Sequence, residues 1–85
     1  MSLGLSQRQG RLLDVLGEHA DAEGRCSLSQ ERLSELTGMP VAAVRNNARA
    51  LDRKGLICVE VHFTAEGMRR RNVYVVVAEE FRGRR

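Results

Sequence analysis

Residues 38–57 read GMPVAAVRNNARALDRKGLI, and they carry the strongest fold signal in the chain. Gly38 is predicted to end one helix, because glycine readily adopts the left-handed conformation found at helix C-termini. Pro40 suits the first position of the next helix, where no backbone N–H is needed. Gly55 then ends that next helix. The stretch therefore predicts two helices joined by a short glycine-containing turn, which is the helix-turn-helix pattern.

The helix predicted over residues 41–54 has two chemically different faces. A helical wheel gives an inward apolar stripe of Val41, Val44, Ala48 and Leu51. The outward side carries Ala42, Asn46, Arg49 and Arg53, with Arg45 beside them. Small side chains such as Ala42 let the helix backbone approach a partner closely.

Asparagine can pair with the adenine edge, and arginine with the guanine edge or a phosphate. We therefore predict that Asn46 and Arg49 face DNA bases, while Arg45 and Arg53 face the DNA backbone. Solvated helix faces often have a similar composition, so this helix alone does not establish binding.

Two further helices are predicted upstream. Ser6 and Gln9 have the spacing of a capping box, so a first helix begins there and is expected to fade over residues 22–24. Ser29 is expected to cap a second helix, with Leu33 and Leu36 facing inward and Gly38 ending it.

The hydrophobic pattern changes from helical spacing to alternation near residue 56. Residues 57–63 read as a strand with Ile57, Val59, Val61 and Phe63 on one buried face. Residues 73–77 are rich in β-branched side chains and read as a second strand. The two form a hairpin with a long tip that contains Arg69, Arg70 and Arg71. A basic hairpin beside a basic helix favours contact with a DNA backbone, and residues 25–28 could add a third, short strand.

Length and charge support one small basic domain over residues 1–85, with a core of about residues 5–78 and a charged tail at 79–85. The formal net charge is +3. Residues 1–24 carry two basic and four acidic groups, whereas residues 25–55 carry six basic and three acidic groups and residues 56–85 carry six and four. The positive charge is thus expected on the part that holds the predicted helix and hairpin. No apolar run approaches the roughly 20 residues of a membrane span.

The sequence offers no constellation typical of an enzyme or a metal site. The soft ligands His19, His62, Cys26 and Cys58 lack metal-ligand spacing, and no glycine-rich phosphate loop occurs. We expect no cofactor, no metal and no small-molecule ligand. The two cysteines are expected to be reduced, small buried residues of a cytoplasmic protein. If residues 25–28 join the hairpin sheet, both cysteines could lie in one layer, which leaves a redox role open.

Residues 27–57 together resemble the winged helix-turn-helix domains of bacterial and phage regulators. The matching positions are Ser29, Leu33, Leu36, Gly38, Met39, Val44, Leu51, Gly55, Leu56 and Ile57. The segment RRRNVYVV, with Asn72 and Tyr74, resembles the second wing strand of such domains. The resemblance extends over about residues 5–78.

This resemblance implies an α+β fold, with a three-helix core and a small antiparallel sheet whose hairpin is the wing. It implies that the helix over 41–54 enters the major groove and that residues 64–72, including Asn72, contact the backbone or the minor groove. Many such domains have Ser or Thr near the start of that helix, where this chain has Pro40, Val41, Ala42 and Ala43.

The expected function is therefore that of a transcriptional regulator that binds double-stranded DNA. One alternative is a winged-helix module for protein–protein contact or dimerisation, since fold does not dictate function. Another is the DNA-binding domain of a plasmid or phage replication protein. RNA is a weaker alternative because few aromatic side chains are available for stacking. The sequence leaves open whether the chain forms a homodimer.

Overall fold

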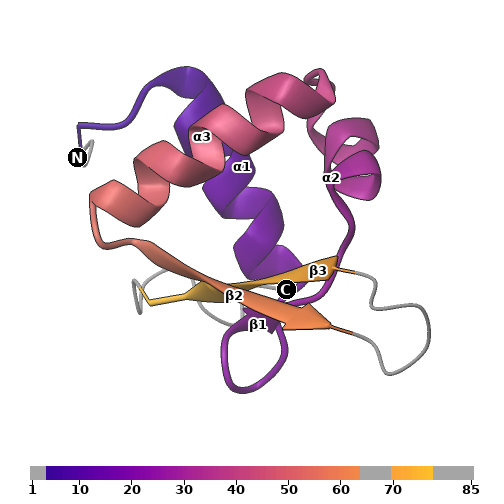
Figure 1. Cartoon of the computed structure of the whole chain (residues 1–85). Coiled ribbons are helices and arrows are strands. Elements are labelled where there is room, and N and C mark those ends of the chain that lie inside the picture. Colours follow the sequence, from indigo (N-terminus) through magenta and orange to yellow (C-terminus); the bar gives the residue numbers. More distant parts are fainter. Residues whose placement is uncertain (1–3, 64–69, 78–85) are drawn as a thin grey trace.

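In the computed structural model, which describes residues 4–63 and 70–77, three helices cover one face of a small sheet (Figure 1). The order is α1 (Gln7–Glu18), β1 (Arg25–Cys26), α2 (Gln30–Thr37), α3 (Val41–Arg53), β2 (Ile57–Phe63) and β3 (Arg70–Val76). The sheet is antiparallel, with strand order β1-β3-β2. The predicted α+β winged helix-turn-helix fold, a three-helix core with a small antiparallel sheet, is confirmed.

The start of α1 follows the sequence prediction. The Ser6 hydroxyl accepts a hydrogen bond from the Gln9 amide at 3.1 Å, and the Gln9 side chain accepts one from the Ser6 amide at 3.1 Å. The end differs, because α1 stops at Glu18 instead of fading over residues 22–24. The Asp21 carboxylate accepts hydrogen bonds from the amides of Glu23 and Arg25, at 2.8 and 3.0 Å. These bonds fold the chain into a turn that leads into β1.

The turn between α2 and α3 is built by local interactions. The Ser29 hydroxyl caps α2 by accepting a bond from the Arg32 amide at 3.0 Å. Gly38 ends α2 with φ of +76°, in the left-handed region. The Met39 amide donates to the Thr37 hydroxyl at 3.3 Å, and the Ser34 hydroxyl donates to the Met39 carbonyl. Pro40 then stands before α3 without a side-chain cap.

The core is aliphatic and is contributed by all three helices and the sheet. The most fully buried side chains are Leu12, Leu13, Leu16, Cys26, Leu33, Val44, Leu51, Ile57, Tyr74 and Val76. The inward stripe predicted for α3 is confirmed at Val44, Ala48 and Leu51, whereas Val41 is partly buried. Packing of this stripe fixes the rotation of α3 about its own axis.

The second strand of the hairpin starts three residues earlier than the predicted strand over 73–77. β3 starts at Arg70, and Arg70, Arg71 and Asn72 pair with Phe63, His62 and Val61 of β2. These three residues therefore belong to the wing strand and not to its tip. The rest of the predicted tip, residues 64–69 with Arg69, lies outside the described residues, as does the predicted tail at 79–85. β1 is also shorter than the predicted strand over 25–28.

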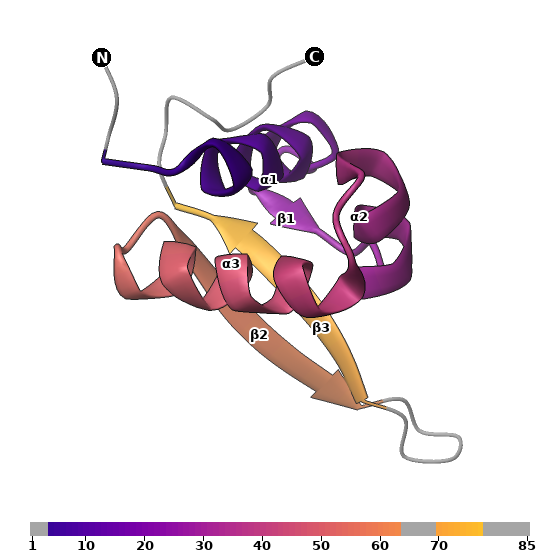
Figure 2. The same ribbon diagram turned by 90° about the horizontal axis from the view of Figure 1, so that it is seen from above.

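The prediction of one buried face along all of β2 is wrong for its second half. Ile57 is buried and Val59 is partly buried, but Val61 is 43% exposed and Phe63 is 63% exposed. The reason is visible in Figure 2, where β2 and β3 run past the helices and leave their far ends uncovered.

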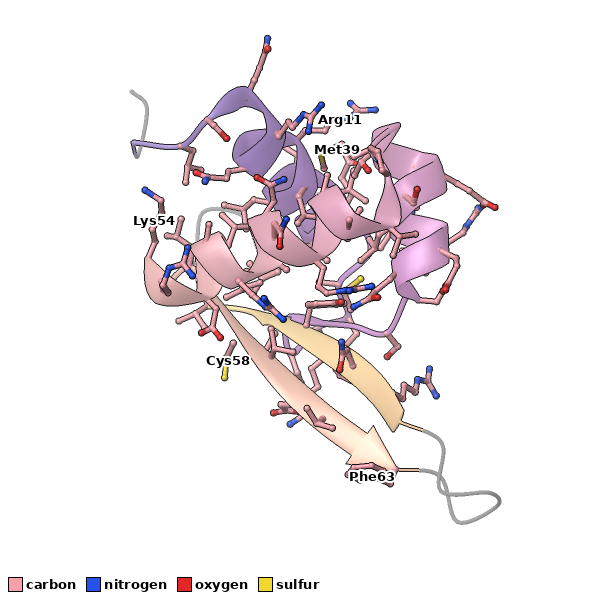
Figure 3. The ribbon with its side chains drawn as sticks, turned by 45° about the horizontal axis from the view of Figure 1, so that its top comes forward. Arg11, Met39, Lys54, Cys58 and Phe63 are labelled. Carbon is pink, nitrogen blue, oxygen red and sulfur yellow. The ribbon has the colours of Figure 1, made fainter. Side chains whose placement is uncertain are left out.

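The two cysteines share the sheet but not a face of it. Cys26 pairs with Tyr74 and Cys58 with Val75, which are neighbours on β3. Consecutive strand residues point to opposite faces, so the two cysteines do not lie in one layer, which was the arrangement that left a redox role open. The expectation that both cysteines are buried holds for Cys26 and is wrong for Cys58, which is exposed (Figure 3). Burial raises the pKa of the Cys26 thiol, an effect that a backbone hydrogen bond at Leu28 opposes.

The described residues contain neither a candidate metal cluster nor a candidate membrane-spanning helix. No group of three or more His, Cys, Asp or Glu residues in 4–63 and 70–77 could hold a metal ion. Within the same ranges, none of the helices has the length and apolar character needed to cross a membrane.

We predict opposite effects for alanine at two glycines. Gly10 lies within α1 with φ in the helical range and no neighbour within 4 Å of an added Cβ, so Gly10→Ala should stabilise the fold by up to about 1 kcal/mol. Gly38 also has open space but a φ of +76°, so Gly38→Ala should destabilise it by roughly 1 kcal/mol through backbone strain. Urea unfolding measures both changes. Equal effects at the two sites would contradict the helical conformation of Gly10 and the left-handed conformation of Gly38.

We also predict that the two thiols react very differently. Iodoacetamide on the folded protein should modify Cys58 and leave Cys26 intact, because Cys26 is inaccessible and its raised pKa disfavours the thiolate. Mass spectrometry of peptides identifies the adducts, and urea-unfolded protein should show both. Fast native labelling of a Cys58→Ser variant would contradict the buried position of Cys26.

Candidate nucleic-acid interface

The outer side of α3 presents the residue types that the sequence selected. Ala42, Arg45, Asn46, Arg49 and Arg53 are all exposed. They are exposed because Val44, Ala48 and Leu51 occupy the opposite side of the helix. Their roles toward DNA remain predictions.

The two neighbouring asparagines of α3 differ in their contacts. The Asn47 amide donates to the Ala43 carbonyl at 2.7 Å and lies 3.9 Å from the Met39 sulfur. Asn47 is therefore bound to its own helix and to the α2–α3 turn. Asn46 is exposed, so its amide is available to an external partner.

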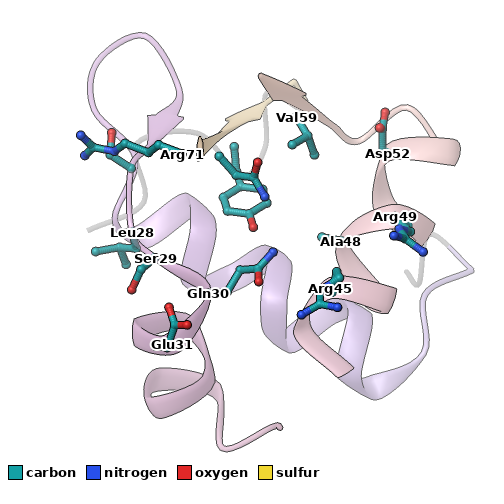
Figure 4. A pocket seen from close by; sticks show the side chains of 13 residues that line it. Leu28, Ser29, Gln30, Glu31, Arg45, Ala48, Arg49, Asp52, Val59 and Arg71 are labelled. Carbon is teal, nitrogen blue, oxygen red and sulfur yellow. The ribbon is translucent and has the colours of Figure 1, made fainter. Parts of the chain in front are cut away.

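A groove of about 950 Å³ lies between the start of α2, one side of α3 and the hairpin (Figure 4). From α2 and the segment before it come Ser27 to Glu31, including Gln30. From α3 come Arg45, Ala48, Arg49 and Asp52. The strands contribute Val59, Arg71, Asn72 and Tyr74.

Four of the nine residues predicted to contact DNA border this groove. Arg45 and Arg49 of α3 line it together with Asn72 of β3, and Arg71 borders it with its side chain extending away from α3 (Figure 4). Ala42, Asn46 and Arg53 lie on the exposed side of α3 and do not line the groove. Arg69 lies outside the described residues, and Arg70 is described only by its backbone pairing with Phe63.

The arginines of this surface have no ion-pair partner in the described part of the chain, unlike Arg25 and Arg32. Arg45, Arg49, Arg53 and Arg71 take part in none of the ion pairs or side-chain hydrogen bonds recorded there. By contrast, Arg25 pairs with Glu60 at 3.5 Å, and Arg32 pairs with Glu35 at 2.9 Å. Arg11 donates to the Leu36 carbonyl at 3.2 Å. Unpaired guanidinium groups are free to neutralise an external anion.

The groove also contains carboxylates, so its charge is mixed. Glu31 and Asp52 line it together with Arg45, Arg49 and Arg71, which leaves an excess of one positive charge. A ligand with localised negative charge would gain most beside the arginines, at a distance from the two carboxylates.

A charged cluster lies on the face of the sheet that points away from the helices. Glu60 accepts from Arg25 of β1 at 3.5 Å and contacts the His62 ring at 3.1 Å. Because β3 lies between β1 and β2, the Arg25–Glu60 pair spans the central strand. Exposed ion pairs contribute little stability, so the cluster mainly adds to the hydrogen-bonded pairing of the wing.

Gln30 and Tyr74 line the groove but were not among the residues predicted to contact DNA. Gln30 follows the Ser29 cap, and at that position it reads as an ordinary first-turn residue. Tyr74 was named only for the resemblance of its segment to a wing strand. The alternation of residues 73–77 could have placed the Tyr74 ring inside, but the position of its hydroxyl depends on how β3 packs against α2 and α3.

The comparisons with known proteins agree with this geometry. A family model described as a helix-turn-helix domain matches residues 3–57. The fold is similar to that of MepR from S. aureus in its crystallised complex with DNA, with a TM-score of 0.64 and 26% sequence identity. That similarity covers 91% of this chain and 61% of the MepR chain. No curated protein matches the sequence. Because the family match covers more than half of its residues, the chain belongs to the helix-turn-helix domain family.

Proposed function

We propose that this chain binds double-stranded DNA and acts as a transcriptional regulator. In this proposal α3 enters the major groove, and the β2–β3 hairpin contacts the adjacent backbone or minor groove. The single observation that carries it is the set of exposed arginines on α3, Arg45, Arg49 and Arg53, none of which has an ion-pair partner in the described part of the chain.

The dimensions of α3 suit this role. Its 13 residues span about 20 Å, and a B-form major groove is wide enough to admit a helix. Asn46 and Arg49 then reach base edges, and Arg45, Arg53, Arg71 and the wing residues Arg69, Arg70 and Asn72 contact the backbone. Ala42 allows close approach at the first turn of the helix.

The likeness to MepR supports the same proposal, because MepR was solved in complex with DNA. This chain spans about three fifths of MepR, so the regulatory role is transferred here as a proposal. We propose no enzymatic activity, and a regulator of this kind would act in the bacterial cytoplasm, where the DNA is.

The start of α3 sets one special condition. Pro40 precedes the helix without a side-chain cap, and Val41, Ala42 and Ala43 offer no hydroxyl for a phosphate. The backbone contacts must therefore come from the arginines and from other elements.

We predict salt-dependent binding to mixed-sequence duplexes, measured by fluorescence anisotropy over a salt series. Each neutralised phosphate contributes about 0.9 to the slope of log K against log salt concentration. Arg45→Ala, which removes a predicted contact to the DNA backbone, should weaken binding and reduce this slope by about 1. Arg8→Ala is the matched control, because it removes the same charge from the exposed surface of α1 outside the groove. Absence of binding at the lowest salt concentration would contradict the proposal.

We predict that Asn46 influences sequence preference. Selection of bound duplexes from a random pool should give a different consensus with Asn46→Ala, because the exposed amide is expected to read a base. Asn47→Ala should leave the consensus unchanged, since the Asn47 amide is held by the Ala43 carbonyl. The same consensus from wild type and Asn46→Ala would remove Asn46 from the base-reading set.

A further inference from the structure

The floor of the groove contains two buried polar atoms that lack a partner. The hydroxyl of Tyr74 and Oδ1 of Asn72 make no hydrogen bond within the described part of the chain. Tyr74 is only 2% exposed, and both residues line the groove. Buried polar groups are almost always hydrogen-bonded, so an unpaired one in a groove needs an explanation.

The ring of Tyr74 has a structural role that its hydroxyl does not share. In the sheet, Tyr74 lies between Cys26 of β1 and Val59 of β2, on the face that packs against the helices. A phenyl ring would fill that position equally well and would avoid the free-energy cost of an unpaired hydroxyl. The hydroxyl therefore indicates a partner that is not part of the described chain.

The surroundings of the hydroxyl indicate the chemistry of that partner. Arg45 and Arg49 from α3 line the same groove. Arg71 of β3 borders it, but its side chain extends away from the two α3 arginines (Figure 4). A hydroxyl donor together with guanidinium groups suits a ligand that has acceptor oxygens and negative charge, which is the chemistry of a phosphate group. The Asn72 amide can serve the same ligand, because a half-turn of the amide exchanges Oδ1 for the donor Nδ2. The start of α2 at Gln30 adds the positive end of a helix dipole.

The position of the groove indicates the source of the phosphate. A major groove and the adjacent minor groove are separated by one sugar–phosphate strand. If α3 enters the first and the hairpin contacts the second, that strand must cross the space between them, where the groove lies. This step rests on the proposed function. Tyr74 of β3 would also supply a hydroxyl for a phosphate, which residues 40–43 at the start of α3 do not offer.

We propose that the Tyr74 hydroxyl donates a hydrogen bond to a phosphate of the DNA strand that crosses this groove, beside Arg45. Gln30 extends from the start of α2 into the groove (Figure 4). Because the Tyr74 hydroxyl is covered in the free protein, the Gln30 side chain is the group expected to rotate when the phosphate enters. The same chemistry would accept the phosphate of a free phosphorylated compound, and the experiment separates the two sources.

The test is Tyr74→Phe, which removes one oxygen and keeps the ring. The thermal midpoint of the free protein should stay the same or rise. Affinity for a duplex should fall at least about tenfold, the effect of losing a hydrogen bond to a charged group. The salt slope should not change, because tyrosine carries no charge, whereas Arg45→Ala and Arg71→Ala should each lower it.

A second arm uses inorganic phosphate, followed by ¹⁵N–¹H NMR at the β3 amides. Loss of duplex affinity in Tyr74→Phe supports the DNA strand as the source. Unchanged duplex affinity with a phosphate response that only wild type shows supports a free phosphate compound and overturns the DNA assignment. Failure of wild type to bind any duplex would sink the proposed function, while this arm still tests the phosphate site.

Two results overturn the proposal outright. One is that neither duplex affinity nor the phosphate response depends on the hydroxyl. The other is a clear fall in the thermal midpoint of Tyr74→Phe, which would mean that the hydroxyl already has a partner in the free protein.

Discussion

The packing of one apolar stripe of α3 determines which side of the helix faces outward. Val44, Ala48 and Leu51 are buried against the other helices and the sheet. Because an α-helix has 3.6 residues per turn, burial of these three side chains fixes the direction in which every other side chain of α3 points. Arg49 and Arg53 are exposed for that reason, and Arg45 is directed toward the hairpin. A substitution that rotated α3 about its axis would redirect these arginines without changing the order or pairing of the helices and strands.

The second constraint is the register of the sheet. β3 is the central strand, so its alternation decides at once what faces the helices and what faces away. Tyr74 and Val76 close the core, and Asn72 continues the same face beyond it, opposite Val61. The groove exists because this face extends past the helices while α3 and the start of α2 stand beside it. A slip of one residue would turn Tyr74 away from the core and would bring Arg71 to the helix side.

Features that depend on neighbouring residues were predictable from the sequence. The Ser6 and Ser29 caps, the left-handed Gly38 and the buried stripe of α3 all follow from short-range rules. The end of α1 was not predictable in the same way, because it depends on the Asp21 carboxylate reaching the Arg25 amide. The start of β3, the exposure of Phe63 and the opposite faces of the two cysteines depend on cross-strand pairing, which the pattern of one strand does not specify.

The candidate site shows the same division. The face of α3 could be derived from periodicity alone, but its position beside Asn72 and Tyr74 depends on the packing of distant segments. The most direct test of DNA binding by this surface is a titration of ¹⁵N-labelled protein with a duplex, followed by NMR. The account predicts shifts at the exposed side of α3, at the start of α2 and along β3, with α1 unaffected. Shifts centred on α1, or none at low salt, would contradict it.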